Sequence, residues 1–220
     1  MKLSFGEYTI QNSSRQIDYI EKIFENVEKR YQTLLDFFKL EKLNKPIRIV
    51  LWDDLEAFRA DELKSGKRTL PMWVCGISST KDDHHLIRTL TLEELCKAQG
   101  HQNSTEKDLE NLILHEIVHA FVRCIVGDKL VKRWLNEGLA TSLAKQRHAK
   151  ANFDCSEEKL LFDTLTNYSN FHVIGNYLIN EKGSDYVLKL LTDSKFLQQE
   201  LASISSGANE YFNSHENALQ

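Results

Sequence analysis

The longest periodic stretch of the chain predicts an amphipathic helix near the N-terminus. Apolar side chains recur there at spacings of three and four residues, with polar side chains between them. Residues with this spacing share one face of a helix, which a globular protein buries against its core. The apolar positions are Ile17, Ile20, Ile23, Phe24, Val27, Tyr31, Leu34, Leu35 and Phe38.

Short runs of β-branched and apolar residues predict strands on either side of this helix. One run covers residues 8–10, and a second covers 47–52. A short helix is expected at 54–63. Two further runs, 72–78 and 85–90, are separated by a polar turn and are therefore expected to form a hairpin.

The second half of the chain has a helical pattern throughout. Thr105 and Asp108 stand in the register of a capping box, and Gly127 follows the last apolar position, so a helix is expected over 106–126. Asn136 is a good N-cap for another helix that runs to about residue 149. Shorter helices are expected at 157–165, 170–180 and 184–191.

The order of these elements predicts an α+β fold. A small mixed sheet with helices comes first, in residues 1–104, and a helical half follows, in residues 105–220. No repeat, linker or charge block divides the sequence. We therefore expect one domain over 1–220 with two subdomains.

Composition narrows the classes of function. The chain is 41% hydrophobic and 27% charged, which is typical of globular proteins and excludes disorder over its whole length. The net charge is −4 with both signs interspersed, so neither nucleic acid nor an anionic membrane is favoured as a partner. There is no apolar run of about 20 residues that could span a membrane, and no signal-peptide pattern. The expected location is cytoplasmic, and the four cysteines are interpreted as reduced thiols.

The segment 115–119, His-Glu-Ile-Val-His, carries the strongest chemical signal. Residues four apart share a helix face, so His115 and His119 can converge on one zinc ion. Glu116 points to one side of the helix face that carries both histidines, where it can hold a metal-bound water and take its proton. The flanking residues are apolar, and burying these three polar groups without a metal would be costly. The alternative is that both histidines are polar positions of a buried helix, satisfied by neighbouring carbonyls.

A second motif, Asn-Glu-Gly-Leu-Ala at 136–140, follows the first. Together the two motifs resemble the gluzincin metallopeptidases, the group of thermolysin-like enzymes and zinc aminopeptidases. The resemblance implies that His115, His119 and Glu137 hold Zn²⁺, that Glu116 is the general base and that water takes the fourth position. It also implies a zincin-like metallopeptidase domain whose helical half contains the active-site helix and the glutamate helix.

The resemblance has further implications for substrate binding and for the residues around the metal ligands. Gluzincins bind extended peptide along an edge strand that precedes the active-site helix, and 85–90 is the candidate; an ordinary exposed strand is the alternative. A Tyr or His from the later helices stabilises the oxyanion in this family, and Tyr168 is the first choice, followed by His172. The alternative is that Tyr168 and His172 are packing or surface residues. Thr141 stands where thermolysin-like enzymes carry an Asp that orients a ligand histidine, so another group must serve that purpose.

These features lead to the expectation of a hydrolase, a zinc-dependent peptidase that cleaves peptide or protein substrates through a Glu116-activated, zinc-bound water. Endopeptidase or oligopeptidase activity is favoured. One alternative is a non-catalytic interaction protein with a gluzincin fold, and another is a regulatory protease dedicated to one protein substrate.

The polar tail at 202–220 has little apolar periodicity beyond Tyr211 and Phe212 and is expected to be loosely docked. A sharper alternative is that it folds into the peptide-binding cleft and blocks it.

Overall fold

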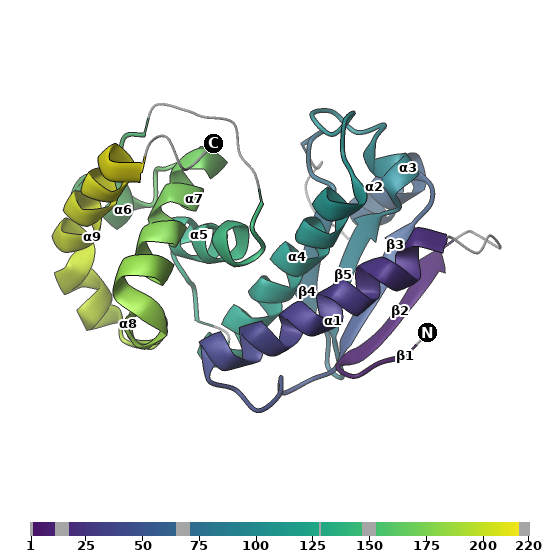
Figure 1. Cartoon of the computed structure of the whole chain (residues 1–220), viewed down its shortest axis with the longest axis horizontal. Coiled ribbons are helices and arrows are strands. Elements are labelled where there is room, and N and C mark those ends of the chain that lie inside the picture. The colour runs from purple at the N-terminus through teal and green to yellow at the C-terminus, as the bar shows by residue number, and fades with distance from the viewer. Residues whose placement is uncertain (1, 12–17, 65–70, 128, 147–152, 216–220) are drawn as a thin grey trace. The chain divides into compact units, whose positions relative to one another are not determined.

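The computed structural model describes residues 2–11, 18–64, 71–127, 129–146 and 153–215 (Figure 1). Ile17 of the predicted helix face, residues 147–149 and residues 216–220 lie outside the described parts. Contacts within the chain divide it into two compact units, Met1–Ala120 and Phe121–Gln220. Their boundary falls inside helix α4 (Glu106–Val126), whereas the change of sequence pattern precedes that helix. In the part of the chain that the structure describes, no helix is long and apolar enough to cross a membrane.

The first unit contains a small mixed sheet, as the element order predicted, and β1 adds a fifth strand to the four that were expected. The strands lie in the order β1-β2-β3-β5-β4. β2, β3 and β5 are parallel to one another, while β1 and β4 run antiparallel to their neighbours. The elements before α4 are β1 (Lys2–Leu3), β2 (Gly6–Gln11), α1 (Asp18–Phe38), β3 (Ile47–Trp52), α2 (Leu55–Lys64), β4 (Gly76–Thr80), β5 (His85–Leu90) and α3 (Leu92–Leu95).

Different helices cover the two faces of this sheet. Tyr8 of β2 stacks on Phe24 of α1, with ring centroids 4.0 Å apart, and Tyr8 pairs with Ile49 in the parallel register. α1 therefore covers the face that carries Ile49. Trp52 has the opposite parity on β3 and contacts Phe58 of α2 at 6.5 Å, so α2 covers the other face. Figure 1 shows α1 and the first part of α4 side by side over the first face.

A buried polar cluster joins α1 to α4. Glu110 and Asn111 of α4 are both buried. Arg30 of α1 donates to Asn111 Oδ1 at 2.8 Å and pairs with Glu110 Oε1 at 3.3 Å, and Asn26 also donates to Glu110 at 3.2 Å. Because Asn111 precedes His115 by one helical turn, this cluster fixes α4 close to the candidate site.

The prediction that residues 85–90 form an edge strand was wrong. β5 has the predicted bounds and forms the predicted hairpin with β4, but it also pairs with β3 on its other side. The edge strand is β4. This strand begins at Gly76, later than predicted, because residues 71–74 form a turn closed by a 3.0 Å hydrogen bond from Val74 N to Pro71 O.

The second unit is helical, as predicted for the C-terminal half. In it α5 packs closely on α7, and α9 packs on α6, α7 and α8 (Figure 1). After the end of α4 it contains α5 (Arg133–Leu143), α6 (Glu157–Phe162), α7 (Tyr168–Tyr177), a π-helical turn η1 (Leu178–Lys182), α8 (Gly183–Thr192) and α9 (Ser194–His215).

Both ends of α4 follow their sequence signals. Thr105 N donates to Asp108 Oδ2 at 2.8 Å, and Asp108 N donates to Thr105 Oγ1 at 3.3 Å, so the capping box is confirmed. Gly127 has a φ of +63° and its N–H bonds Arg123 O at 2.9 Å. A glycine adopts this left-handed conformation without steric cost, which explains why the helix ends there.

The predicted start of α5 was wrong. The helix begins at Arg133, and Asn136 lies inside it instead of capping it. Its first backbone donors are satisfied from a distant part of the chain: Asp163 accepts from Arg133 N at 2.7 Å and from Trp134 N at 3.2 Å. A local reading of the sequence cannot find a cap that comes from thirty residues away.

The prediction of a loosely docked tail was also wrong, because residues 194–215 form α9. Its buried face includes Leu201, Ile204 and Tyr211, and small or polar residues fill the positions between them. Ser205 Oγ and Asn209 Nδ2 both donate to Cys155 O, at 3.0 and 2.8 Å. The pattern looked weak because part of this buried face is polar and hydrogen-bonded.

Candidate metal centre

The two histidines of the first motif lie one turn apart on α4 and are buried, with 5% and 8% of their surfaces exposed. His115 Nε2 and His119 Nε2 are 3.1 Å apart, with the rings nearly perpendicular. Two nitrogens bound to one tetrahedral zinc at about 2.0–2.1 Å would lie about 3.3 Å from each other. The two ring nitrogens therefore have nearly the spacing that a shared metal ion requires.

The structure brings Glu137 of α5 to these histidines. One ligand atom from each of His115, His119 and Glu137 lies within 4.8 Å of the others. A group of two imidazoles and one carboxylate can hold a metal ion. The sequence pattern located all three residues, although it expected Glu137 at the first position of its helix, and it occupies the fifth.

Glycines hold the helix of Glu137 in place. A Cβ built on Gly175 of α7 would lie 2.0 Å from Gly138 O, and one built on Gly138 would lie 2.8 Å from Phe171 O. α5 and α7 thus touch through their backbones at the residue next to Glu137. Ser142 Oγ adds a hydrogen bond to His172 O at 3.0 Å. Both contacts are compatible only with small side chains at this crossing.

Thr141 hydrogen-bonds within its own helix. Its Oγ1 donates to Glu137 O at 2.8 Å and lies 3.1 Å from Gly138 O. The Thr141 hydroxyl is therefore satisfied within α5.

Glu116 lies against the backbone of the edge strand. It is 5% exposed, and a Cβ built on Gly76 of β4 would lie 2.7 Å from its Oε1. Sequence reasoning did not single out Gly76. The signal was present, however, because a glycine within a strand often marks a close approach by another group.

The two edges of the sheet differ in how open they are. β1 is only two residues long in the described part of the chain, and short edge strands resist pairing with other chains. β4 has five residues, Gly-Ile-Ser-Ser-Thr, without charge or proline. The open edge is therefore the one that Glu116 contacts.

Tyr168 and His172 both lie on α7, the helix that packs on α5. The ring of Tyr168 meets Phe171 edge-on at 5.5 Å. His172 Nε2 is 3.0 Å from Asn176 Nδ2, and burial lowers the pKa of this histidine, which favours the neutral ring at pH 7. The oxyanion role stays a prediction for Tyr168 and for His172.

Cys75 precedes Gly76 and is fully buried. Burial raises the pKa of its thiol to about 11, so the group is protonated at neutral pH. All four cysteines are free. These findings agree with the interpretation of the cysteines as reduced thiols.

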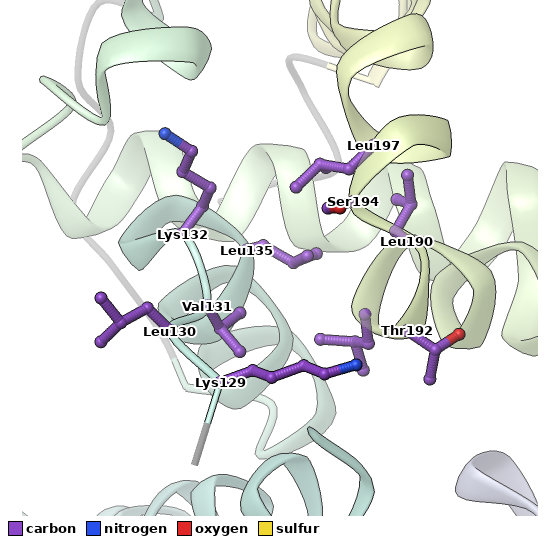
Figure 2. Close-up of a pocket in the computed structure, with 10 residues that line it drawn as sticks. Lys129, Leu130, Val131, Lys132, Leu135, Leu190, Thr192, Ser194 and Leu197 are labelled. Carbon is purple, nitrogen blue, oxygen red and sulfur yellow. The ribbon is translucent and has the colours of Figure 1, made fainter. Parts of the chain in front are cut away.

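The second unit contains a separate cavity of about 280 Å³ (Figure 2). Leu135, Leu190 and Leu197 line it, and Lys129 reaches across it toward Thr192. Among the described residues that line this cavity there is no histidine, cysteine or carboxylate. It is therefore not a candidate metal centre.

No protein-family model matches the sequence, and no curated protein matches it either. The candidate function therefore rests on the residues and their geometry.

Proposed function

We propose that the chain is a zinc-dependent peptidase of the gluzincin type with a zincin-like fold. One observation carries the proposal: Glu116 shares its helix turn with two histidines whose ring nitrogens are 3.1 Å apart, and its carboxylate lies close to Gly76 of the open edge strand. This arrangement places a carboxylate beside a metal-binding group and beside a strand that can bind extended peptide. All three parts are needed for metal-assisted hydrolysis of a peptide.

The donor set favours zinc. Imidazole and carboxylate ligands suit Zn²⁺, and catalytic zinc sites commonly have three protein ligands such as His₂Glu. His115, His119 and Glu137 would hold the ion, in keeping with the 3.1 Å separation of the imidazole nitrogens. Bound zinc would supply Lewis-acid polarisation of the scissile carbonyl and lower the pKa of water.

The chain's own groups would perform the proton transfers. Glu116 would accept a proton from the attacking water through its carboxylate and then donate it to the leaving nitrogen. Its carboxylate lies close to the β4 backbone at Gly76, where a bound peptide would pass. Tyr168 is the proposed oxyanion donor, since it lies on the helix that packs on α5.

The substrate would add to β4 as a further strand. An edge strand offers unpaired N–H and C=O groups, and an extended peptide can pair with them independently of its sequence. Because Glu116 lies at Gly76, the scissile bond would lie beside this residue. Peptides or flexible protein loops are therefore the proposed substrates.

The test is cleavage of a peptide pool by zinc-loaded wild type and Glu116→Gln, followed by mass spectrometry. Losing the base should lower the rate by about 10²- to 10⁴-fold while zinc content stays the same. Glu106→Gln is the matched control, because Glu106 begins the same helix and forms an exposed 3.6 Å ion pair with Lys22. It should cleave at the wild-type rate.

Two outcomes would change the proposal. Equal turnover in wild type and Glu116→Gln would show that Glu116 is not the base. Retained zinc without cleavage of any peptide in the pool would favour an interaction protein or a protease dedicated to a single protein substrate.

A further inference from the structure

Large exposed apolar side chains of the first unit gather at one end of the open edge strand. Among the described residues of this unit they are Leu63, Met72 and Trp73, with exposed fractions of 52%, 53% and 45%. Met72 and Trp73 lie in the turn that leads into β4. Leu63 lies on α2, one helical turn after Arg59, and Arg59 donates to Met72 O at 3.0 Å. We call these three residues the apolar shelf.

Hydrogen bonds to the backbone fix the shelf. Besides the Arg59 bond, His101 Nε2 lies 3.2 Å from Trp73 O, and Val74 N donates to Pro71 O at 3.0 Å. The turn is thus held through its carbonyl oxygens, and about half of the surface of Met72 and of Trp73 is exposed. Clustered exposed apolar residues of this kind mark interaction sites.

The shelf is within reach of a peptide bound on β4. Trp73 precedes Gly76 by three residues, and three residues span at most about 11 Å. An extended peptide that pairs with β4 and has its scissile bond beside Gly76 covers this distance in three or four residues. One of its side chains would therefore meet the shelf while Glu116 faces the bond to be cut.

We infer that the apolar shelf selects substrates with a large apolar side chain two to four positions from the scissile bond, on one side of it. This inference rests on the proposed peptidase function and names its substrate class. The three shelf side chains are uncharged, and Arg59, which bonds the shelf backbone, is paired with Glu56 at 3.4 Å, so the shelf favours uncharged side chains. A flexible methionine accommodates different shapes, so aliphatic and aromatic residues should both be accepted.

The first experiment measures binding without cleavage. Zinc-loaded Glu116→Gln protein is incubated with a random peptide pool, and retained peptides are sequenced. They should be enriched in Leu, Met, Phe and Trp, and the enrichment should disappear when Met72→Ser and Trp73→Ser are added. The hydrogen bonds of both residues to Arg59 and His101 use backbone oxygens, so these changes leave the turn intact. Leu130→Ser, a fully exposed apolar residue of the second unit, is the control.

The second experiment measures cleavage in the wild-type background. Peptides with an apolar residue at the selected position should lose about ten- to hundredfold in kcat/KM when both shelf residues become serine, because burial of one large apolar side chain is lost. Peptides with serine there should be cut equally by both proteins.

The outcomes separate the two proposals. Apolar enrichment that depends on Met72 and Trp73 supports the shelf, even if the wild type cleaves no peptide. Absence of cleavage would count against the peptidase function and not against the shelf. Cleavage with an unchanged profile in the shelf variant would overturn the shelf and leave the peptidase standing. Absence of enrichment in the binding selection would overturn the shelf. The shelf would also be overturned if the wild type sediments as a dimer and the shelf variant as a monomer, because the shelf would then bind a second copy of the chain.

Discussion

The position of Glu116 depends on the absence of a side chain at Gly76. A Cβ there would lie 2.7 Å from Glu116 Oε1 and 2.9 Å from Leu112 Cδ1. Both neighbouring atoms are the ends of side chains, which can move at little cost to folding. The consequence of a larger residue would therefore appear in the chemistry before it appears in stability.

Gly76→Ala should lower kcat/KM by about 10²-fold, because displacing a catalytic group by about 1 Å has an effect of this size. The free energy of unfolding should change by less than about 1 kcal/mol, and zinc content should not change. Peptide turnover, urea unfolding and metal analysis test the three expectations. Ser78→Ala is the matched control on the same face of β4 and should behave as wild type. Full activity in Gly76→Ala would contradict the account of how Glu116 is held.

At the scale of secondary-structure elements, the crossing of α5 and α7 determines where Glu137 lies. The Cβ of an alanine at Gly175 would meet backbone atoms of Gly138 at 2.0 and 2.5 Å, and backbone cannot move as a side chain does. The two helices would have to separate, and Glu137 would shift with α5.

Gly175→Ala should therefore destabilise the protein by about 1–3 kcal/mol and also weaken zinc binding by tenfold or more. Gly207→Ala provides a comparison, since its Cβ would lie 2.1 Å from Tyr177 Oη and disturb α9 on the same helix α7. It should lower stability but leave zinc affinity unchanged. Competition with a chromophoric chelator measures the affinity, and equal zinc affinities in both variants would refute a special role for the α5–α7 crossing.

Local signals predicted elements well where the stabilising contacts are local. α4 has the predicted bounds because its cap, Thr105 with Asp108, and its stop, Gly127, are part of the helix itself. The start of α5 could not be predicted, because Asp163 supplies its cap. α9 escaped notice because Ser205 and other small residues share its buried face with apolar ones.

For the candidate site, the sequence predicted the metal-ligand residues and the base but not which edge strand lies beside them. The spacing of His115 and His119 follows from the helix repeat, and Glu137 follows from a motif. The identity of the edge strand depends on β5 pairing with both β3 and β4, and pairing between distant strands leaves no mark on the strand itself. The same reason explains why the apolar shelf could not be found before the fold was known, whereas Gly76 carried a weak signal as a glycine within a strand.

At the scale of the whole molecule, the sheet presents one closed and one open edge, and the ligand residues come from two successive helices. His115 and His119 belong to α4, and Glu137 belongs to α5. Metal binding by residues from two helices favours the folded chain over the unfolded one, because the unfolded chain does not hold them together. Metal content is therefore the property on which the whole account depends.

The most direct test is the zinc content of untagged wild type and Glu137→Ala, measured by plasma mass spectrometry after dialysis. Glu158→Ala, an exposed glutamate on α6, is the control. We predict one zinc ion per chain in wild type and control, and weakened binding in Glu137→Ala. A chain that takes up no zinc after reconstitution at neutral pH, or that binds it equally well without Glu137, would contradict the proposed centre.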